Sequence, residues 1–268
     1  KEGKAVTIIS EEEIKASGKE DVVQVLEIIP GISVSREGTD GGLAYIFMRG
    51  SEGNNVLVMI DGVRISDPSS TDSRFDLSLI KTDSIERIEI VRGSMSSLYG
   101  SEASGGVINI ITKKGMEESG GSILIEGGNH GWFRGSVRGT AVLSDDVKVT
   151  VGYTKTQETS EINIRKRTDG TYDKATDYRG NDFTFGIEKG KWAFSGAWGD
   201  FDSDWENTYN YDLSTVYKNT QENKYRRFAI TYADEVNSGK IYYNDNQKDY
   251  SYYSDPLYVS SYEYKDSS

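Results

Sequence analysis

The sequence lacks most of the residues on which nucleophilic and metal-based catalysis depend. Among its 268 residues there is no cysteine and one histidine, His130. Disulfides and thiol chemistry are therefore excluded, and a Ser-His-Asp triad could use only this one imidazole. His130 lies in the stretch GGNHGW with no second histidine or cysteine nearby, and we interpret it as a turn residue. Any catalysis would have to rest on carboxylates.

Positive charge is also in short supply. Lysine and arginine number 31 against 43 aspartates and glutamates, which gives a formal net charge of −12. Nucleic acids attract basic surfaces through their phosphates, so an acidic chain of this kind is a poor partner for them. We therefore expect no nucleic-acid partner.

Long hydrophobic runs are absent. The longest, such as 56–60, extend over about five residues, whereas a transmembrane helix needs about 20. Residues 1–10 have no apolar core of the kind found in a signal peptide. A membrane role would have to use the strands of a β-barrel, which carry a much weaker sequence signal.

Aromatic residues are scarce in the first part of the chain and abundant in the second. Only four precede residue 116, whereas twenty-six lie from Trp132 onward. A shift of this size, with charged residues and glycine at the transition, predicts a domain boundary. We expect one domain over 1–116 and another over 117–268.

The first domain has the pattern of an α+β fold. Ser10 and Glu13 have the spacing of a capping box, which predicts the start of a helix. A second helix is expected over 20–29, where Pro30-Gly31 ends it. Segment 56–65 predicts a tight type I′ hairpin around Asp61-Gly62, and two further strands are expected at 87–91 and 107–112.

The second domain alternates polar and apolar residues, as strands of an antiparallel sheet do. Short turns at 144–146, 189–190 and 237–239 are expected to separate long polar loops at about 158–181 and 202–223. Alternation alone favours a soluble β-sandwich. The loop asymmetry, the aromatic enrichment and the strand length instead favour about seven strands of an outer-membrane barrel.

The glycine-rich stretch VRGSMSSLYGSEASGGVINIITKKG, 91–115, tests the case for a nucleotide site. It has no lysine at the position a Walker loop requires, and a strand follows Gly105-Gly106 where a phosphate-binding helix would be needed. We interpret its glycines as turns and points of close backbone approach.

Four blocks then carry a resemblance. They are EIIPGISV (27–34), IFMRG (46–50), VLVMIDGVRI (56–65) and the long block 85–115. In this order and spacing they resemble the plug domain of TonB-dependent outer-membrane receptors. One departure is Ser94, where the family commonly has proline.

The resemblance implies an α+β plug domain followed by antiparallel transmembrane β-barrel strands. Within the family, segments 195–214 and 243–256 resemble the aromatic, Asn-Tyr-Asp-containing segments of cobalamin receptors. Siderophore and haem receptors share the plug and remain alternatives, because barrel loops vary freely.

Residue roles follow from the same resemblance. Arg49 and Arg92 match plug arginines that pair with glutamates on the barrel wall, and a water-excluded arginine needs such a partner. The plug positions that contact ligand in cobalamin receptors fall on Leu43, Tyr45, Glu52, Ser70 and Thr71. The alternative for each is an exposed polar loop.

The long loops collect carboxylates, which suit calcium as hard oxygen ligands. Resemblance to the cobalamin receptors points to Tyr211 and Asp212 as calcium ligands. The clustering of carboxylates adds Asp173 and Asp177, whose spacing departs from that of these receptors. A solvated acidic loop is the alternative, and we expect no required cofactor.

The function implied is import of a scarce, bulky nutrient through the outer membrane, with TonB and its inner-membrane complex supplying the energy and with no enzymatic activity. The TonB box is expected upstream of Lys4. About seven strands cannot close a barrel of about 22. A second chain, or the remainder of a longer receptor, is expected to supply the other strands, and we favour the longer receptor.

Two other classes compete with this interpretation. A soluble carbohydrate-binding or adhesin protein would stay in buffer without detergent. A carboxylate hydrolase would need two carboxyl groups about 5 to 9.5 Å apart in a cleft, and no segment singles out such a pair.

Overall fold

The computed structural model forms two compact units that divide between Lys113 and Lys114. Unit 1 comprises Lys1–Glu37 and Leu43–Lys113, and unit 2 contains Lys114–Ser268. The structure describes residues 5–36, 44–51, 55–66, 75, 77–113, 118–129, 131–144, 146–159, 163–166, 172–174, 177–207, 216–234, 236–255 and 262–267.

Unit 1 is built on a mixed five-stranded sheet with the order β1-β6-β7-β4-β5. Neighbouring strands are antiparallel except for β4 and β7, which run parallel. A parallel pair cannot be closed by a tight turn, so the chain between them must cross over the sheet. The strands are β1 (Ala5–Ser10), β4 (Val56–Ile60), β5 (Val63–Arg64), β6 (Ile85–Arg92) and β7 (Gly106–Thr112).

Two short helices follow their predicted caps. In α1 (Glu11–Ser17) the Ser10 hydroxyl accepts from the Glu13 amide, and the Glu13 carboxylate accepts from the Ser10 amide, so the predicted capping box is confirmed. α2 (Val22–Glu27) is shorter than expected, because the Asp21 carboxylate caps it by accepting from the Gln24 amide. Its Val22, Val25 and Leu26 are almost fully buried.

The predicted hairpin at Asp61-Gly62 is confirmed. Both residues have positive φ, 50° and 75°, as a type I′ turn requires. The turn is tied to the end of β7, because the Asp61 carboxylate accepts from the amide and from the hydroxyl of Thr112, at 2.9 and 2.7 Å.

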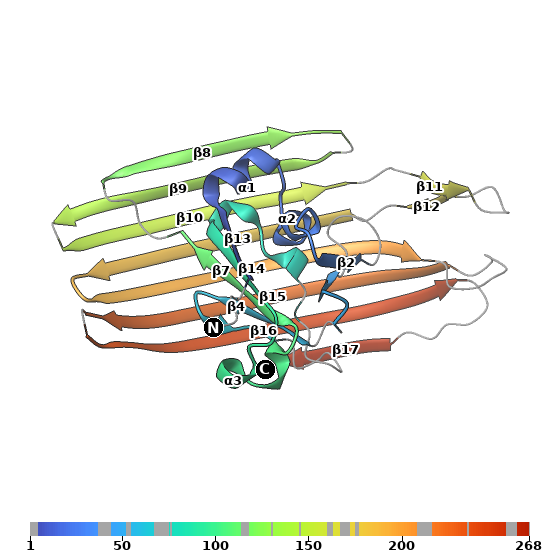
Figure 1. Cartoon of the computed structure of the whole chain (residues 1–268). Helices are drawn as coiled ribbons and strands as arrows, with labels where there is room; N and C mark the ends of the chain where they lie inside the picture. The colour runs from blue at the N-terminus through green and yellow to red at the C-terminus, as the bar shows by residue number, and fades with distance from the viewer. Residues whose placement is uncertain are drawn as a thin grey trace. The chain divides into compact units, whose positions relative to one another are not determined.

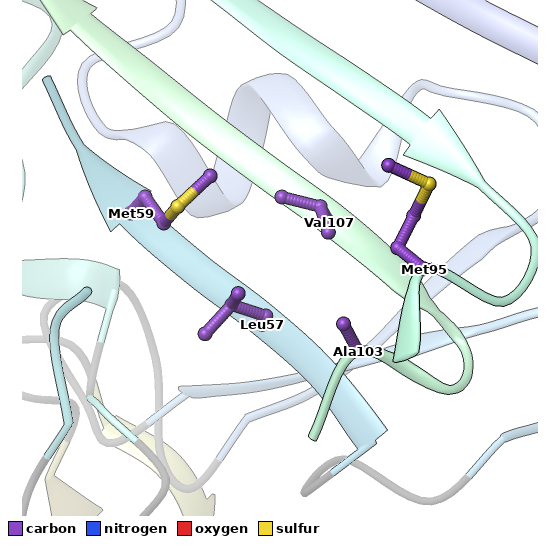
Figure 2. Close-up of a cluster of buried hydrophobic side chains, with 5 residues drawn as sticks. All are labelled: Leu57, Met59, Met95, Ala103 and Val107. Atoms are coloured by element: carbon purple, nitrogen blue, oxygen red, sulfur yellow. The ribbon is translucent and has the colours of Figure 1, made fainter. Parts of the chain in front are cut away.

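The glycine-rich segment folds back onto one face of this sheet. It forms α3 (Ser96–Tyr99) and the 3-10 turn η4 (Ser101–Ala103), and it places Met95 and Ala103 against Leu57, Met59 and Val107. Figure 2 shows these side chains over β4 and β7. The stretch is therefore a covering layer for the sheet, which agrees with the prediction that it is no phosphate loop.

Close approach explains two of its glycines. A Cβ on Gly105 would lie 2.5 Å from the Ser51 hydroxyl oxygen, and one on Gly106 would lie 2.4 Å from the Met48 sulfur.

Unit 1 also contains a two-stranded sheet of β2 (Ile32–Arg36) and β3 (Ala44–Met48), and the 3-10 turns η2 (Leu77–Leu79) and η3 (Thr82–Ser84).

Unit 2 contains an eight-stranded antiparallel meander with the order β17-β16-β15-β14-β13-β10-β9-β8. Its strands run side by side as long ribbons in Figure 1. They are β8 (Gly120–Gly127), β9 (Phe133–Ser144), β10 (Val147–Glu158), β13 (Asp177–Lys189), β14 (Trp192–Asn207), β15 (Val216–Ala233), β16 (Ser238–Asp255) and β17 (Tyr262–Ser267).

The predicted boundaries of the long loops are wrong. The first, 158–181, contains a hairpin of β11 (Asn163–Lys166) and β12 (Tyr172–Lys174), and β13 already begins at Asp177. The second, 202–223, is mostly strand. The prediction took clustered carboxylates as a sign of a loop. A strand with one polar face can carry the same residues, because the hydrogen bonds between strands are made by the backbone and do not depend on side-chain charge.

The predicted fold class, an α+β plug domain followed by antiparallel strands of a partial barrel, is confirmed. About seven strands were expected, and the described main sheet has eight, of which β17 pairs with β16. Within the described residues, no helix has the length and hydrophobicity needed to cross a membrane.

Candidate functional site

The structure brings the two predicted anchor arginines together. Arg49 follows β3 and Arg92 ends β6, and both flank Gly31. A Cβ on Gly31 would lie 3.9 Å from Cγ of Arg49 and 3.9 Å from Nε of Arg92. The sequence predicted a common role for the two residues but gave no sign of their proximity.

Arg49 is held by its backbone. Its φ of 52° lies in the left-handed region, which is unusual for a side chain of this size. The Arg49 amide donates to the Gly31 carbonyl at 2.9 Å, and this bond fixes the turn after β3. The side chain is exposed on unit 1.

Arg92 is held by its side chain. Nη1 donates to the Thr7 hydroxyl of β1 at 2.6 Å, whereas Nε is buried and has no hydrogen-bond partner. No ion pair of Arg49 or Arg92 occurs within the part of the chain that the structure describes. A half-buried guanidinium without a carboxylate is costly, so an acidic partner would stabilise Arg92.

The predicted ligand residues are described only in part. Tyr45 lies half-buried in β3, opposite Ser35 of β2. The remaining four, Leu43, Glu52, Ser70 and Thr71, lie outside the described residues.

The predicted calcium ligands are also divided. Asp173 lies opposite Arg165 in the β11–β12 hairpin, and Asp177 lies opposite Asp204 across β13 and β14. Tyr211 and Asp212 lie outside the described residues. Among the residues that are described, no group of three acidic or histidine side chains could hold a metal ion. Asp177 and Asp204, on neighbouring strands, could supply only part of the oxygen ligands that calcium needs. Calcium binding stays a prediction.

Unit 2 has an amphipathic sheet of unusual polarity. Large apolar side chains such as Ile123, Leu143 and Trp192 are exposed on one face, whereas Arg134, Thr140 and other polar residues on the opposite face are buried. Soluble sheets ordinarily show the reverse, with apolar residues packed on a core. An apolar outer face with a polar inner face is the arrangement of a transmembrane barrel wall.

Aromatic side chains concentrate on the apolar face of β13 to β16. Phe183 and Trp198 have ring centroids 4.0 Å apart, and Phe185 packs beside Phe194 at 5.3 Å. Gly196 makes room for this cluster, because a Cβ there would lie 2.2 Å from Cε1 of Phe185.

The turn between β15 and β16 is organised by one carboxylate. Asp234 accepts from the Tyr232 hydroxyl at 2.6 Å and from the amides of Val236 and Asn237 at 2.9 and 2.7 Å. These hydrogen bonds, with the Tyr232 hydroxyl first among them, lower the pKa of Asp234 to about 2. Lys191 of the neighbouring turn lies 3.6 Å from the same carboxylate.

Sequence reasoning missed one set of buried polar residues. Ser203, Gln221 and Asn223 lie on the polar face of β14 and β15, within the segment that was assigned to a loop. The signal for them was present, since the alternation in FDSDW (201–205) and QENKYR (221–226) continues the strand period.

The comparisons with known proteins agree with this geometry. Residues 1–107 match the family described as TonB-dependent Receptor Plug Domain. These residues therefore carry a TonB-dependent receptor plug domain, and antiparallel strands with the fold of a partial barrel follow them.

Two relatives are similar in sequence to part of this chain. Both are named vitamin B12 transporter BtuB, one from Photobacterium profundum and one from Vibrio vulnificus. The Photobacterium protein is 40% identical over 136 residues, which cover 50% of this chain and 22% of that protein. The Vibrio protein is also 40% identical, over 120 residues that cover 45% of this chain and 19% of that protein. The chain thus spans about a fifth of the length of these curated relatives.

The solved structures support the fold. The siderophore receptors PiuA and PirA from Acinetobacter baumannii superpose with TM-scores of 0.69 and 0.67 at 16% and 18% identity. The superpositions cover 93% and 98% of this chain, and 37% and 43% of the two receptors. At this level of identity they establish the architecture and leave the ligand open.

Proposed function

We propose that this chain is part of an outer-membrane receptor that imports cobalamin or a related corrinoid with energy supplied through TonB. The observation that carries the proposal is the 40% identity to vitamin B12 transporters over 136 residues, which extend through half of this chain. The plug family supports TonB dependence, and the apolar outer face of unit 2 supports placement in a lipid bilayer.

Arg49 and Arg92 are proposed to anchor the plug to glutamates of the barrel wall. Their position on either side of Gly31, and the unpaired Nε of Arg92, support this role. The proposed ligand contacts at the plug loops are Leu43, Tyr45, Glu52, Ser70 and Thr71. The proposed calcium ligands are Asp173, Asp177, Tyr211 and Asp212.

Calorimetric titration of the full-length protein in detergent tests the ligand. We expect cyanocobalamin to bind with a measurable heat and ferric enterobactin to give none. Binding of ferric enterobactin without cyanocobalamin would replace the corrinoid with a ferric siderophore. The family assignment rests on the plug and would be unaffected by that result.

A further inference from the structure

One end of the main sheet of unit 2 carries a row of lysine and aromatic side chains. Tight turns join β13 to β14 and β15 to β16 at this end, which lies on the left in Figure 1. In the register of the sheet Lys189 lies opposite Trp192, and Trp192 lies opposite Tyr232. Residues directly opposite on adjacent strands present their side chains on the same face. The three side chains therefore share one face of the sheet.

This face is apolar on the side of the row that leads away from the turns. Ile187 precedes Lys189 by two residues on β13 and lies opposite Phe194, which in turn lies opposite Ile230. All three apolar side chains are exposed, and Trp192 is 57% exposed. The row thus marks the line at which exposed apolar surface gives way to charge. Such a line is expected where the hydrocarbon of a bilayer meets the headgroups.

Lys191 joins the row from the turn between β13 and β14. This turn has two residues, with Gly190 first at a φ of 54°, which is the arrangement of a type II′ hairpin. The Gly190 amide donates to the Asp146 carbonyl, and the Ala233 amide donates to the Lys191 carbonyl, so both adjoining turns fix its position. The Lys191 ammonium lies 3.6 Å from the Asp234 carboxylate, and the lysine side chain is 62% exposed. The ammonium is therefore held in place and still accessible.

The two lysines leave positive charge available at the edge of the apolar face. Lys189 is exposed, and its ammonium forms no ion pair with any residue that the structure describes. The carboxylates of the adjoining turns are occupied by local donors. Asp234 accepts from the Tyr232 hydroxyl and from two backbone amides, and Asp146 accepts from the Ser144 hydroxyl at 2.9 Å. A ligand that neutralises the lysines must therefore bring its own negative charge.

The phosphodiester of a lipid headgroup meets these requirements. Lysine binds phosphate as a compact point charge, and its long stem can stay on apolar surface while the ammonium reaches the headgroup layer. Tryptophan and tyrosine rings are enriched at the same depth of a membrane. A zwitterionic headgroup would also bring an ammonium group, whose natural partner, a carboxylate, is already occupied in these turns. The row thus fits a headgroup that carries a phosphate and no cation.

We infer that Lys189, Lys191, Trp192 and Tyr232 form a binding site for an anionic glycerophospholipid such as phosphatidylglycerol. The two lysines bind the phosphate, the aromatic rings lie beside the start of the acyl chains, and Asp234 holds Lys191 in position. This inference rests on the proposed placement of unit 2 in a lipid bilayer and does not depend on which nutrient is imported. Short turns face the periplasm in barrels of this kind, so the lipid belongs to the periplasmic leaflet.

Native mass spectrometry of the full-length protein tests the inference. The protein is kept in an uncharged maltoside detergent and titrated with phosphatidylglycerol, phosphatidylethanolamine or an uncharged diglucosyl diacylglycerol with the same acyl chains. We expect phosphatidylglycerol to bind most tightly. The variant is Lys189→Gln with Lys191→Gln, which removes both charges and keeps the glycine of the turn. We expect its dissociation constant for phosphatidylglycerol to rise about thirtyfold, as the loss of two cations near an anionic surface implies.

The matched control is Lys148→Gln with Lys240→Gln, which removes two charges from the same end of the sheet. Lys148 follows Val147, which lies opposite Lys189, so Lys148 is on the other face. By the same alternation Lys240 of β16 lies on that other face, opposite Thr231. We expect the control to bind phosphatidylglycerol within about twofold of the unchanged protein. Equal losses in the two variants would overturn the inference, because net charge would then hold the lipid.

Two further results would overturn it. Phosphatidylethanolamine or the glycolipid binding as tightly as phosphatidylglycerol would show that the row does not select an anionic headgroup. Inorganic phosphate that displaces phosphatidylglycerol at equal concentration would show a site for free phosphate in place of a lipid site. The melting temperature of each variant shows whether it is folded.

Calorimetric titration with cyanocobalamin separates this inference from the proposed function. We expect the Lys189→Gln, Lys191→Gln variant to bind cyanocobalamin as tightly as the unchanged protein does. Selective binding of phosphatidylglycerol without binding of cyanocobalamin would uphold the lipid site and refute the corrinoid. Binding of cyanocobalamin without selection among the lipids would do the opposite. Absence of both would refute both.

Discussion

Arg92 shows how one residue joins local and distant structure. Its Nη1 reaches β1 through the Thr7 hydroxyl, while its Nε is buried and unpaired beside Gly31. The first contact is within unit 1, and the second atom is available to the proposed glutamate of the barrel wall. Substitutions at Arg92 and Thr7 therefore distinguish the two interactions.

We expect Arg92→Ala to destabilise the full-length protein more than Thr7→Val does. Thr7→Val removes one hydrogen bond, worth about 0.5–1.5 kcal/mol. Arg92→Ala also leaves the proposed wall carboxylate buried and unpaired, at a cost of about 3–5 kcal/mol. Denaturant unfolding in detergent measures both. Equal losses for the two variants would show that Arg92 has no partner beyond Thr7.

The sequence predicted residues whose role depends on local chemistry and missed those whose role depends on packing. Ser10, Glu13 and the Asp61-Gly62 turn were predicted because caps and tight turns depend on a few neighbouring residues. The proximity of Arg49 and Arg92 could not be predicted, because β3 and β6 belong to different sheets and only tertiary packing around Gly31 brings the two side chains together.

At the scale of elements, the turn between β15 and β16 links two neighbouring hairpins. The Asp234 carboxylate accepts a hydrogen bond from the Tyr232 hydroxyl of its own hairpin. The Lys191 ammonium, from the turn between β13 and β14, lies beside the same carboxylate. The Ala233 amide also donates to the Lys191 carbonyl at 3.0 Å. Adjacent hairpins are thus held in register beyond the ends of their strands.

This turn is expected to weaken in acid. The folded pKa of Asp234, about 2, lies below its ordinary value of 3.8, so the carboxylate contributes stability above pH 4. That contribution is lost as pH falls from about 4 through about 2. A ¹³C NMR titration of the Asp234 carboxyl in the folded protein measures the pKa.

The matched variant is Tyr232→Phe, which removes the hydroxyl that lowers this pKa most. We expect the pKa of Asp234 to rise toward 3.8 in the variant. A carboxyl that already titrates near 3.8 in the unchanged protein would contradict the hydrogen bonding described for the turn.

The strands of unit 2 also explain why their boundaries were mispredicted. The charged residues Asp202 and Glu222 were assigned to a loop, yet they lie on one face of paired strands. Their neighbours on the other face, Ser203 and Asn223, are polar as well, so hydrophobicity no longer marks the strand. In this part of the chain only the two-residue period remains as a signal.

At the scale of the whole molecule, the proposed calcium site would join the long hairpins. We expect calcium at 100 times its dissociation constant to stabilise the full-length protein by about 2.7 kcal/mol, and a chelator to reverse this. Asp177→Asn should abolish the gain. Asp202→Asn, a carboxylate of the neighbouring strand that is not a proposed ligand, is the control. Thermal unfolding with and without calcium measures the effect, and an unchanged melting temperature would refute the site.

The exposed apolar side chains of unit 2 favour a lipid or detergent environment. Exposed side chains such as Ile123, Ile125 and Leu143 would cost about 25 cal/mol per Å² of apolar surface in water. A soluble carbohydrate-binding protein, which the alternating sequence also allowed, would bury such residues in a core.

The antiparallel meander of unit 2 limits how the number of strands in such a sheet can change during evolution. Every strand from β8 to β17 in the main sheet pairs only with the strands nearest to it along the chain, apart from the small β11–β12 hairpin. Duplication or deletion of one hairpin therefore adds or removes two strands and keeps every remaining residue on its original face. Gain or loss of a single strand would reverse the direction of the chain at the junction. The number of strands in a sheet of this topology can consequently change in steps of two.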